Sequence, residues 1–203
     1  MGKAEQTKTY VTRIAAFLFN KKGYFGTSVD EIVVAARLTR GSLYGHFENK
    51  EDLYNSASEY LLEEWLKGLR TVLAGATSAG HKMEAFFQWY ETEAVAAAYG
   101  GSPVINLATE ADDLSPAVSS KTGTSIARLM RLLSETLTDG IANGELSDQL
   151  DPLEFACLTL SALEGAAALT RVTGKLHNLR SVCNFLREEL HRLENFDRSA
   201  RSK

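Results

Sequence analysis

The chain has 203 residues, of which 44% are hydrophobic and 24% charged, which is ordinary for a globular protein and excludes a disordered or fibrous one. Lys and Arg total 22 against 26 Asp and Glu, and a net charge of −4 argues, over the whole chain, against nucleic-acid binding. No apolar run approaches the roughly 20 residues of a membrane span, the first residues lack a signal peptide's apolar stretch, and two cysteines build no disulfide scaffold, so we expect a cytoplasmic protein without a membrane partner.

Helical periodicity dominates the sequence and predicts an all-α fold of about nine helices. Only three prolines interrupt the chain, and we find no convincing strand alternation. Apolar residues spaced three and four apart over residues 11–19 predict a first helix that stops at Gly23. Later segments predict helices over residues 50–73, 82–99, 104–111, 116–142 and 152–173, and a last helix with apolar positions from 179 to 193.

Two short helices between the first and the fourth have the size of a helix-turn-helix unit. Thr27 is expected to cap one of them, with Asp30 in the capping-box position, and this helix runs to Ala36. Thr39 is expected to cap the other, which runs to about Phe47. A tight connection between two such helices is typical of the unit that lays its second helix in the DNA major groove.

The second short helix carries side chains that suit DNA contact. Thr39, Arg40 and Ser42 stand in its first turn, where Arg can bind guanine O6 and N7 and Ser can pair with several bases. Four more side chains can donate to phosphates. Thr27 stands at the start of the first short helix, and Tyr44, His46 and Lys50 follow the first turn of the second. Residues 1–53 carry a net charge of +2 and the remainder −6, so the basic excess coincides with this unit.

Residues 7–53 resemble the DNA-binding domain of the TetR family of one-component transcriptional regulators. The matching positions are Val11, Ile14, Ala15, Leu18, Phe19, Gly23, Tyr24, 27–29, Ile32, Ala35, Ala36, 38–41, Leu43, Tyr44, His46, Phe47, Lys50 and Leu53. The resemblance implies a nine-helix fold in a two-fold dimer, and a repressor whose C-terminal domain binds a small molecule and then releases DNA. It also implies base contacts by Arg40 and Ser42 and phosphate contacts by Thr27, Thr39, Tyr44, His46 and Lys50.

Arg37 departs from this pattern, because the family usually has glycine in the turn. A residue other than glycine there must accept a strained backbone conformation or change the turn. Arg37 could instead add a phosphate contact. Both interpretations stay open, and Arg37 is kept among the candidate DNA-binding residues.

Aromatic residues of the C-terminal part could line a pocket for a flat apolar or aromatic molecule, or they could simply pack the core. The candidates are Trp65, Phe86, Phe87 and Tyr90. Asn106 and Glu110 stand one helical turn apart and could supply polar recognition of that molecule, or they could be a cap and a solvated face. We take Asn106 together with the aromatic residues as the candidate ligand-binding set.

Several chemistries are not expected. Residues 101–110 resemble a subgroup of the family in which a cysteine that senses electrophiles in some members follows the glycine, but Ser102 stands here and cannot do thiolate chemistry. Cys157 and Cys183 lie on apolar helical faces and are expected to be buried and inert. The histidines lack ligand spacing, so neither a metal nor a cofactor is expected, and no nucleophile–base set or phosphate loop indicates an enzyme.

The last two helices carry the surfaces of a possible four-helix bundle between two chains. One helix has small residues at Ser161, Ala162, Gly165, Ala166, Ala167 and Ala168. The other has an apolar stripe at Leu179, Val182, Leu186, Leu190 and Leu193. Both surfaces could instead close the chain's own core, and the family resemblance favours the dimer.

The sequence therefore predicts a homodimeric repressor with a helix-turn-helix DNA-binding domain over residues 1–50 and a ligand-binding and dimerisation domain over residues 51–203. Its partners would be a pseudo-palindromic double-stranded DNA operator and a small apolar or aromatic effector that releases it. The alternative is a helix-turn-helix DNA-binding protein controlled by a protein partner.

Overall fold

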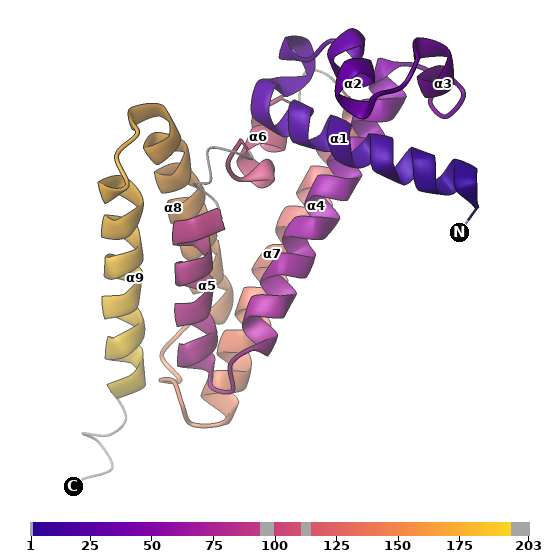
Figure 1. The fold of residues 1–203 in the computed structure, drawn as a ribbon. Helices are drawn as coiled ribbons and strands as arrows, with labels where there is room; N and C mark the ends of the chain where they lie inside the picture. The colour runs from indigo at the N-terminus through magenta and orange to yellow at the C-terminus, as the bar shows by residue number, and fades with distance from the viewer. Residues whose placement is uncertain (1, 94–99, 111–114, 196–203) are drawn as a thin grey trace, which may run out of the picture. The chain divides into compact units, whose positions relative to one another are not determined.

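The computed structural model describes residues 2–93, 100–110 and 115–195, which form nine α-helices and no strand (Figure 1). The predicted all-α fold is therefore confirmed. The chain divides into two compact units, an N-terminal unit made of residues 1–65 and 97–125 and a C-terminal unit made of residues 66–96 and 126–203. The boundaries fall inside two long helices, α4 and α7, which each contribute to both units.

The N-terminal unit brings together helices that are far apart in the sequence. Its elements are α1 (Lys3–Gly26), α2 (Val29–Ala36), α3 (Arg40–Tyr44), α6 (Pro103–Glu110) and the first parts of α4 (Lys50–Ala74) and α7 (Pro116–Ala142). Helix α1 packs against both α2 and α6, and α2 packs against α3. Gly23 has φ 75° and interrupts α1, as the predicted helix stop requires.

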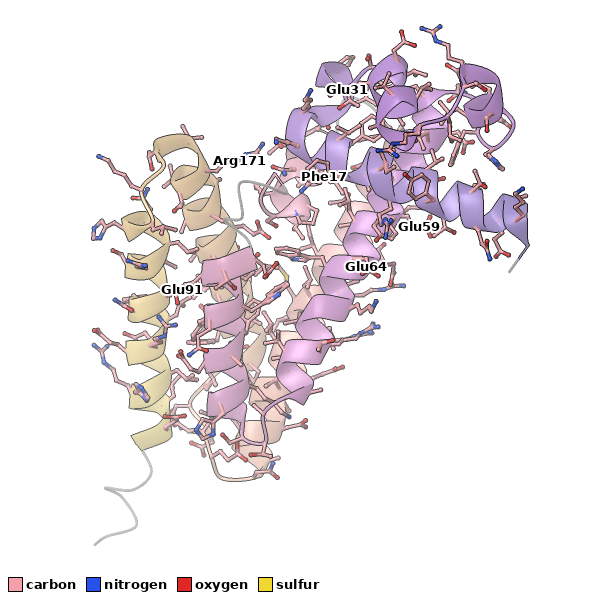
Figure 2. All side chains as sticks on the ribbon, in the orientation of Figure 1. Phe17, Glu31, Glu59, Glu64, Glu91 and Arg171 are labelled. Carbon is pink, nitrogen blue, oxygen red and sulfur yellow. The ribbon has the colours of Figure 1, made fainter. Side chains whose placement is uncertain are left out.

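The core of this unit comes from the apolar positions that the helical spacing singles out. Val11 and Phe19 of α1 and Ile32 of α2 are buried, and burying a side chain of this size contributes about 1.5–3 kcal/mol. Phe19 packs edge-on against Tyr54 of α4, with ring centroids 5.1 Å apart. Glu59 of α4 pairs with Lys121 of α7 at 2.5 Å on the surface of the same unit (Figure 2).

Two helix boundaries near the turn differ from the prediction. Ser28, not Thr27, caps α2, because its Oγ accepts a hydrogen bond from the Glu31 N–H at 3.1 Å. Helix α3 ends at Tyr44 and does not continue to Phe47. The chain leaves the helix there, and the Phe47 ring enters the core, where its exposed fraction is 2%.

The C-terminal unit contains α5 (Ala79–Glu93), α8 (Pro152–Thr173), α9 (His177–Asn195) and the remaining parts of α4 and α7. Helix α9 packs against α8 and α5 (Figure 1). Arg187 of α9 forms ion pairs with Glu84 and Glu91 of α5, at 2.7 and 3.0 Å (Figure 2 labels Glu91). The predicted ends of α5 and α6, at residues 94–99 and 111, lie outside the described residues.

Helix α8 begins where the sequence predicts, since the Asp151 carboxylate accepts hydrogen bonds from the Leu153 and Glu154 N–H groups at 2.9 and 3.0 Å. Gly174 in the left-handed conformation ends it. By length and composition α8 is long and apolar enough to cross a membrane, contrary to the expectation from the sequence. In the structure its inner face is packed inside the unit and includes a buried carboxylate, Glu164, whose exposed fraction is 6%.

Candidate nucleic-acid interface

Arg37 closes α2 in the left-handed conformation, with φ 54° and ψ 42°. Its N–H donates to the Val34 carbonyl at 3.1 Å, and the Leu38 N–H donates to the Val33 carbonyl at 3.0 Å. This hydrogen bonding is how a glycine normally ends a helix. Arg37 therefore keeps the tight turn and accepts a strained backbone conformation, as one of the two interpretations required. Its side chain is exposed and available for a phosphate.

Helix α3 is short and presents its polar side chains outward. Thr39 caps it, as predicted, by accepting the Ser42 N–H at 3.1 Å. Thr39 and Arg40 are exposed, Tyr44 has an exposed fraction of 46%, and Ser42 is half-buried. His46, also half-buried, lies in the turn that follows. The first turn of α3 is thus a surface from which base edges could be reached.

Arg40 is engaged by a neighbouring helix. Its Nε donates to Asp30 Oδ1 at 2.6 Å and its Nη2 to Asp30 Oδ2 at 2.5 Å. This fork uses donors with which Arg40 was expected to read guanine. The hydrogen bond from Arg40 also holds the pKa of Asp30 below its ordinary value. Both groups lie in solvent, where ion pairs are weak, so the pair can open when a stronger acceptor arrives.

Lys50, a predicted phosphate contact, stands at the start of α4 and points partly into the fold. Its Nζ donates to the Tyr24 carbonyl at 2.6 Å and lies 4.1 Å from the centroid of the Tyr24 ring. Desolvation lowers the pKa of Lys50, and the nearby charge of Glu110 opposes that change. The ammonium has three donors, and the hydrogen bond to Tyr24 occupies one of them.

Thr27, the remaining predicted phosphate contact, is fully buried. Its Oγ1 lies 2.8 Å from the Gly23 carbonyl and 3.2 Å from the Leu18 carbonyl, and its N–H donates to the Tyr24 carbonyl. The structure therefore places this hydroxyl in the interior, where it holds the connection between α1 and α2.

Helix α6 is anchored to the last turn of α1 and to α4. The Glu110 carboxylate accepts the Tyr24 N–H at 2.6 Å and the Tyr54 hydroxyl at 3.1 Å. Sequence reasoning considered Glu110 only for a ligand or as a solvated residue. Nothing in the local pattern shows these partners, because Glu110 lies 86 residues from Tyr24 and 56 from Tyr54.

Asn106 supplies a second anchor of α6. Its Nδ2 lies 2.9 Å from both Asn20 Oδ1 and the Gly100 carbonyl, and 3.2 Å from the Asn20 carbonyl. Asn20 in turn donates to the Gly101 carbonyl at 3.0 Å. Gly100 has φ 88°, and a Cβ there would lie 2.4 Å from the Asn20 carbonyl oxygen, so the close approach needs glycine.

The five predicted ligand-binding residues are divided between the units. Trp65 and Asn106 belong to the N-terminal unit, whereas Phe86, Phe87 and Tyr90 lie buried together in the C-terminal unit. The ring centroids of Phe86 and Tyr90 are 5.2 Å apart.

This aromatic group is less apolar than the sequence suggested, because the Tyr90 hydroxyl donates to the buried Glu164 carboxylate. A cleft of about 330 Å³ in the same unit is lined by none of the five residues; its lining is Arg70, Leu73, Ala74, Ala76, Lys82, Leu132, Glu135, Thr136 and Asp139.

The exposed surface of α8 and α9 differs from the predicted dimer interface at the apolar stripe of α9. Leu179, Leu186 and Leu190 of the α9 stripe are buried inside the chain's own unit. The apolar residues that remain exposed lie elsewhere on these helices and on their connection, namely Leu153, Leu158, Leu169, Val172, Leu176 and Phe185. Of the small residues, Ser161, Ala162 and Gly165 are exposed, while Ala166 and Ala167 are buried.

The two cysteines differ in their surroundings. Cys183 is buried as expected, and burial raises the pKa of its thiol to about 12. Cys157 is exposed, so the expectation of a buried thiol is wrong there. It stands on the outward side of α8, next to exposed Leu158. The described residues contain no cluster of three or more His, Cys, Asp or Glu side chains that could hold a metal ion.

Comparison with known proteins agrees with this geometry. Residues 12–57 match the model of bacterial regulatory proteins of the tetR family, and residues 81–186 match the tetracyclin repressor-like C-terminal domain. A TetR transcriptional regulator from Chloroflexus aurantiacus J-10-FL is 30% identical with a TM-score of 0.88, over 95% of this chain and 98% of that one.

Two further relatives match over shorter stretches of the chain. The HTH-type transcriptional regulator AcrR of Shigella flexneri is 39% identical over 57 residues, which is 28% of this chain and 26% of AcrR. The biofilm operon icaADBC negative transcriptional regulator IcaR of Staphylococcus epidermidis is 42% identical over 45 residues, which is 22% of this chain and 24% of IcaR. From the two domain matches and the full-length likeness, the chain belongs to the TetR family of transcriptional regulators, which are not enzymes.

Proposed function

We propose that this chain is a homodimeric repressor that binds a pseudo-palindromic operator of double-stranded DNA and releases it when a small molecule binds. Residues 1–50 would form the DNA-binding domain and residues 51–203 the ligand-binding and dimerisation domain. Repression is supported by a likeness over 45 residues to IcaR, a negative transcriptional regulator. The match of residues 81–186 to the tetracyclin repressor-like C-terminal domain supports control by a ligand.

The observation that carries the proposal is the exposed first turn of α3. Thr39 and Arg40 stand outward on a helix held by a tight turn, with Tyr44 and His46 following. Hydroxyl, guanidinium and imidazole groups are the donors that bind base edges and phosphates. Arg40 and Ser42 would read bases, and Arg37, Thr39, Tyr44, His46 and Lys50 would contact phosphates. Thr27, with its buried hydroxyl, is not part of this set.

The dimer would form through the outward faces of α8 and α9. Leu158, Leu169 and Val172 of α8 and Phe185 of α9 have exposed fractions of 59% to 85%. Gly165 lies on the same outward side of α8 and lets a partner helix approach closely. Two such faces related by a two-fold axis would bury each other's apolar surface in a four-helix bundle and place two α3 helices on one duplex.

The effector would be a small apolar or aromatic molecule, and the candidates for its contacts in the C-terminal unit are Phe86, Phe87 and Tyr90. Aromatic side chains bind flat molecules through stacking and edge-to-face contacts. The effector can shift the regulator between its DNA-bound and free states only by its differential affinity for the two.

Selection from a pool of random DNA duplexes with the purified full-length chain tests the proposal. We expect pseudo-palindromic sites whose half-site centres lie about 34–36 Å apart or a multiple of this distance. Arg40→Ala should relax the base preference at the position that it contacts, whereas Arg131→Ala, an exposed arginine of the C-terminal unit, should leave it unchanged. Recovery of no sequence preference by the wild-type chain would overturn the proposed function.

A further inference from the structure

The Glu110 carboxylate connects α6 to α1 and α4. One carboxylate oxygen accepts the N–H of Tyr24, in the last turn of α1, and the other accepts the hydroxyl of Tyr54, on α4. Gly23 makes this approach possible, because a Cβ at that position would lie 2.5 Å from Glu110 Oε1. A charged acceptor that binds two donors in this way fixes both of them more firmly than a neutral one.

The backbone of Tyr24 also holds Lys50, a predicted phosphate contact. Tyr24 is held by Glu110 at its N–H and by Lys50 at its carbonyl, at 2.6 Å in each case. The Lys50 ammonium also lies over the Tyr24 ring, at 4.1 Å from its centroid. Glu110 therefore acts on Lys50 in two ways, through the Tyr24 backbone and through its charge, which raises the pKa that burial lowers.

We propose that Glu110 is a positioning residue for operator binding. It fixes Tyr24, and through Tyr24 it sets where the Lys50 ammonium and the start of α4 stand beside the α2–α3 unit. A segment 56 residues from Tyr54 in the sequence would thus set the geometry of the DNA-binding surface without contacting DNA. This inference rests on the proposed function, in which Lys50 contacts a DNA phosphate.

The test is a double-mutant cycle on operator affinity, measured over a range of salt concentrations with a duplex selected by the wild-type chain. Lys50→Ala should lower the slope of log affinity against log salt by about one, the effect of one lost phosphate contact. Glu110→Ala should lower it similarly, because Lys50 loses its anchor. The double variant should then bind little worse than either single variant.

Two further variants separate positioning from general loss of structure. Glu110→Gln keeps an oxygen for the Tyr24 N–H but removes the charge, so it should fall between wild type and Glu110→Ala in both affinity and slope. If Glu110→Ala does not fold, Glu110→Gln replaces it in the double-mutant cycle with Lys50→Ala. Glu59→Gln removes a carboxylate charge from the same unit, where it pairs only with Lys121 among the contacts seen, and should leave the slope unchanged.

The outcomes separate the inference from the function on which it rests. If the wild-type chain selects no DNA site, the proposed function fails. If it selects a site, but folded Glu110 variants keep the wild-type slope or lose affinity additively with Lys50→Ala, the positioning role of Glu110 fails while DNA binding stands.

Discussion

Arg40 of α3 and Asp30 of α2 form a two-point ion pair, with Nε–Oδ1 and Nη2–Oδ2 distances of 2.6 and 2.5 Å. The pair occupies donors that base recognition would need, and it places a negative charge on the surface that faces DNA in the proposed function. Because both side chains are 63% exposed, water screens their attraction and the pair opens at little cost.

Asp30→Asn should therefore strengthen operator binding several-fold, because it frees the guanidinium and removes a charge that repels phosphates. Quantitative fluorescence anisotropy on a selected duplex measures the effect. Glu59→Gln, which removes an equal charge elsewhere on the N-terminal unit, serves as the matched control. Weaker binding by Asp30→Asn would show instead that Asp30 aligns Arg40 for its target.

The stability of the Asp30–Arg40 ion pair depends on pH in a defined direction. Arg40 lowers the pKa of Asp30 from 3.8, so the pair's contribution is complete above the ordinary aspartate range and is lost as pH falls through the lowered pKa. The advantage of Asp30→Asn over the wild type should therefore stay constant from neutral pH down to about pH 5. An advantage that vanishes within that interval contradicts this assignment.

Arg37→Gly should stabilise the fold, because glycine adopts the left-handed conformation at φ 54° without strain. We expect a gain of about 1 kcal/mol in the free energy of unfolding, since relief of strain exceeds glycine's extra freedom in the unfolded chain. Chemical denaturation measures this change. A loss of stability would mean that packing by the arginine side chain outweighs the backbone term.

The salt slope of operator binding by the same variant tests the second interpretation of Arg37. A drop of about one identifies a phosphate contact, and an unchanged slope limits Arg37 to the turn. Arg37→Asn is the control, because asparagine tolerates the left-handed conformation and lacks the charge.

Leu169→Glu and Phe185→Glu should each convert the dimer to a folded monomer. Both side chains have an exposed fraction of 59% in the single chain, so a charge there costs little in the monomer but would be buried in the proposed interface. Analytical ultracentrifugation reports the mass and circular dichroism the fold. Val34→Glu, at an exposed α2 position, should stay dimeric. A Leu169→Glu chain of wild-type mass would place the interface elsewhere.

The reaction of the thiols with iodoacetamide at pH 8 tests the packing of the C-terminal unit. The thiolate is the reactive form, and burial raises the pKa of Cys183 to about 12, so Cys183 should stay unmodified in the folded chain. Both thiols should react after denaturation. In Cys157→Ser, mass spectrometry should find no adduct before unfolding, and an adduct on Cys183 there would mean that the C-terminal unit opens readily.

The helical fold could be predicted because its signals are local. Proline at the start of α7 and α8, Gly23 at the interruption of α1 and the three-and-four spacing of apolar residues all act within a few residues of themselves. The cap at Thr39 follows from the same short-range chemistry. The predicted cap at Thr27 is wrong, because the neighbouring Ser28 hydroxyl can cap equally well and the Thr27 side chain is buried.

By itself, then, the sequence determined the all-α fold, the helix-turn-helix and the side chains of α3 that suit DNA. Only the tertiary structure decided which partners those side chains have. Asp30 engages Arg40, and Glu110 reaches Tyr24 across 86 residues. An apolar stripe such as that of α9 shows that a face is buried but not by which chain, and Leu186 turns out to lie inside its own unit. Long-range contacts depend on how helices meet in space, and helical periodicity carries no information about that.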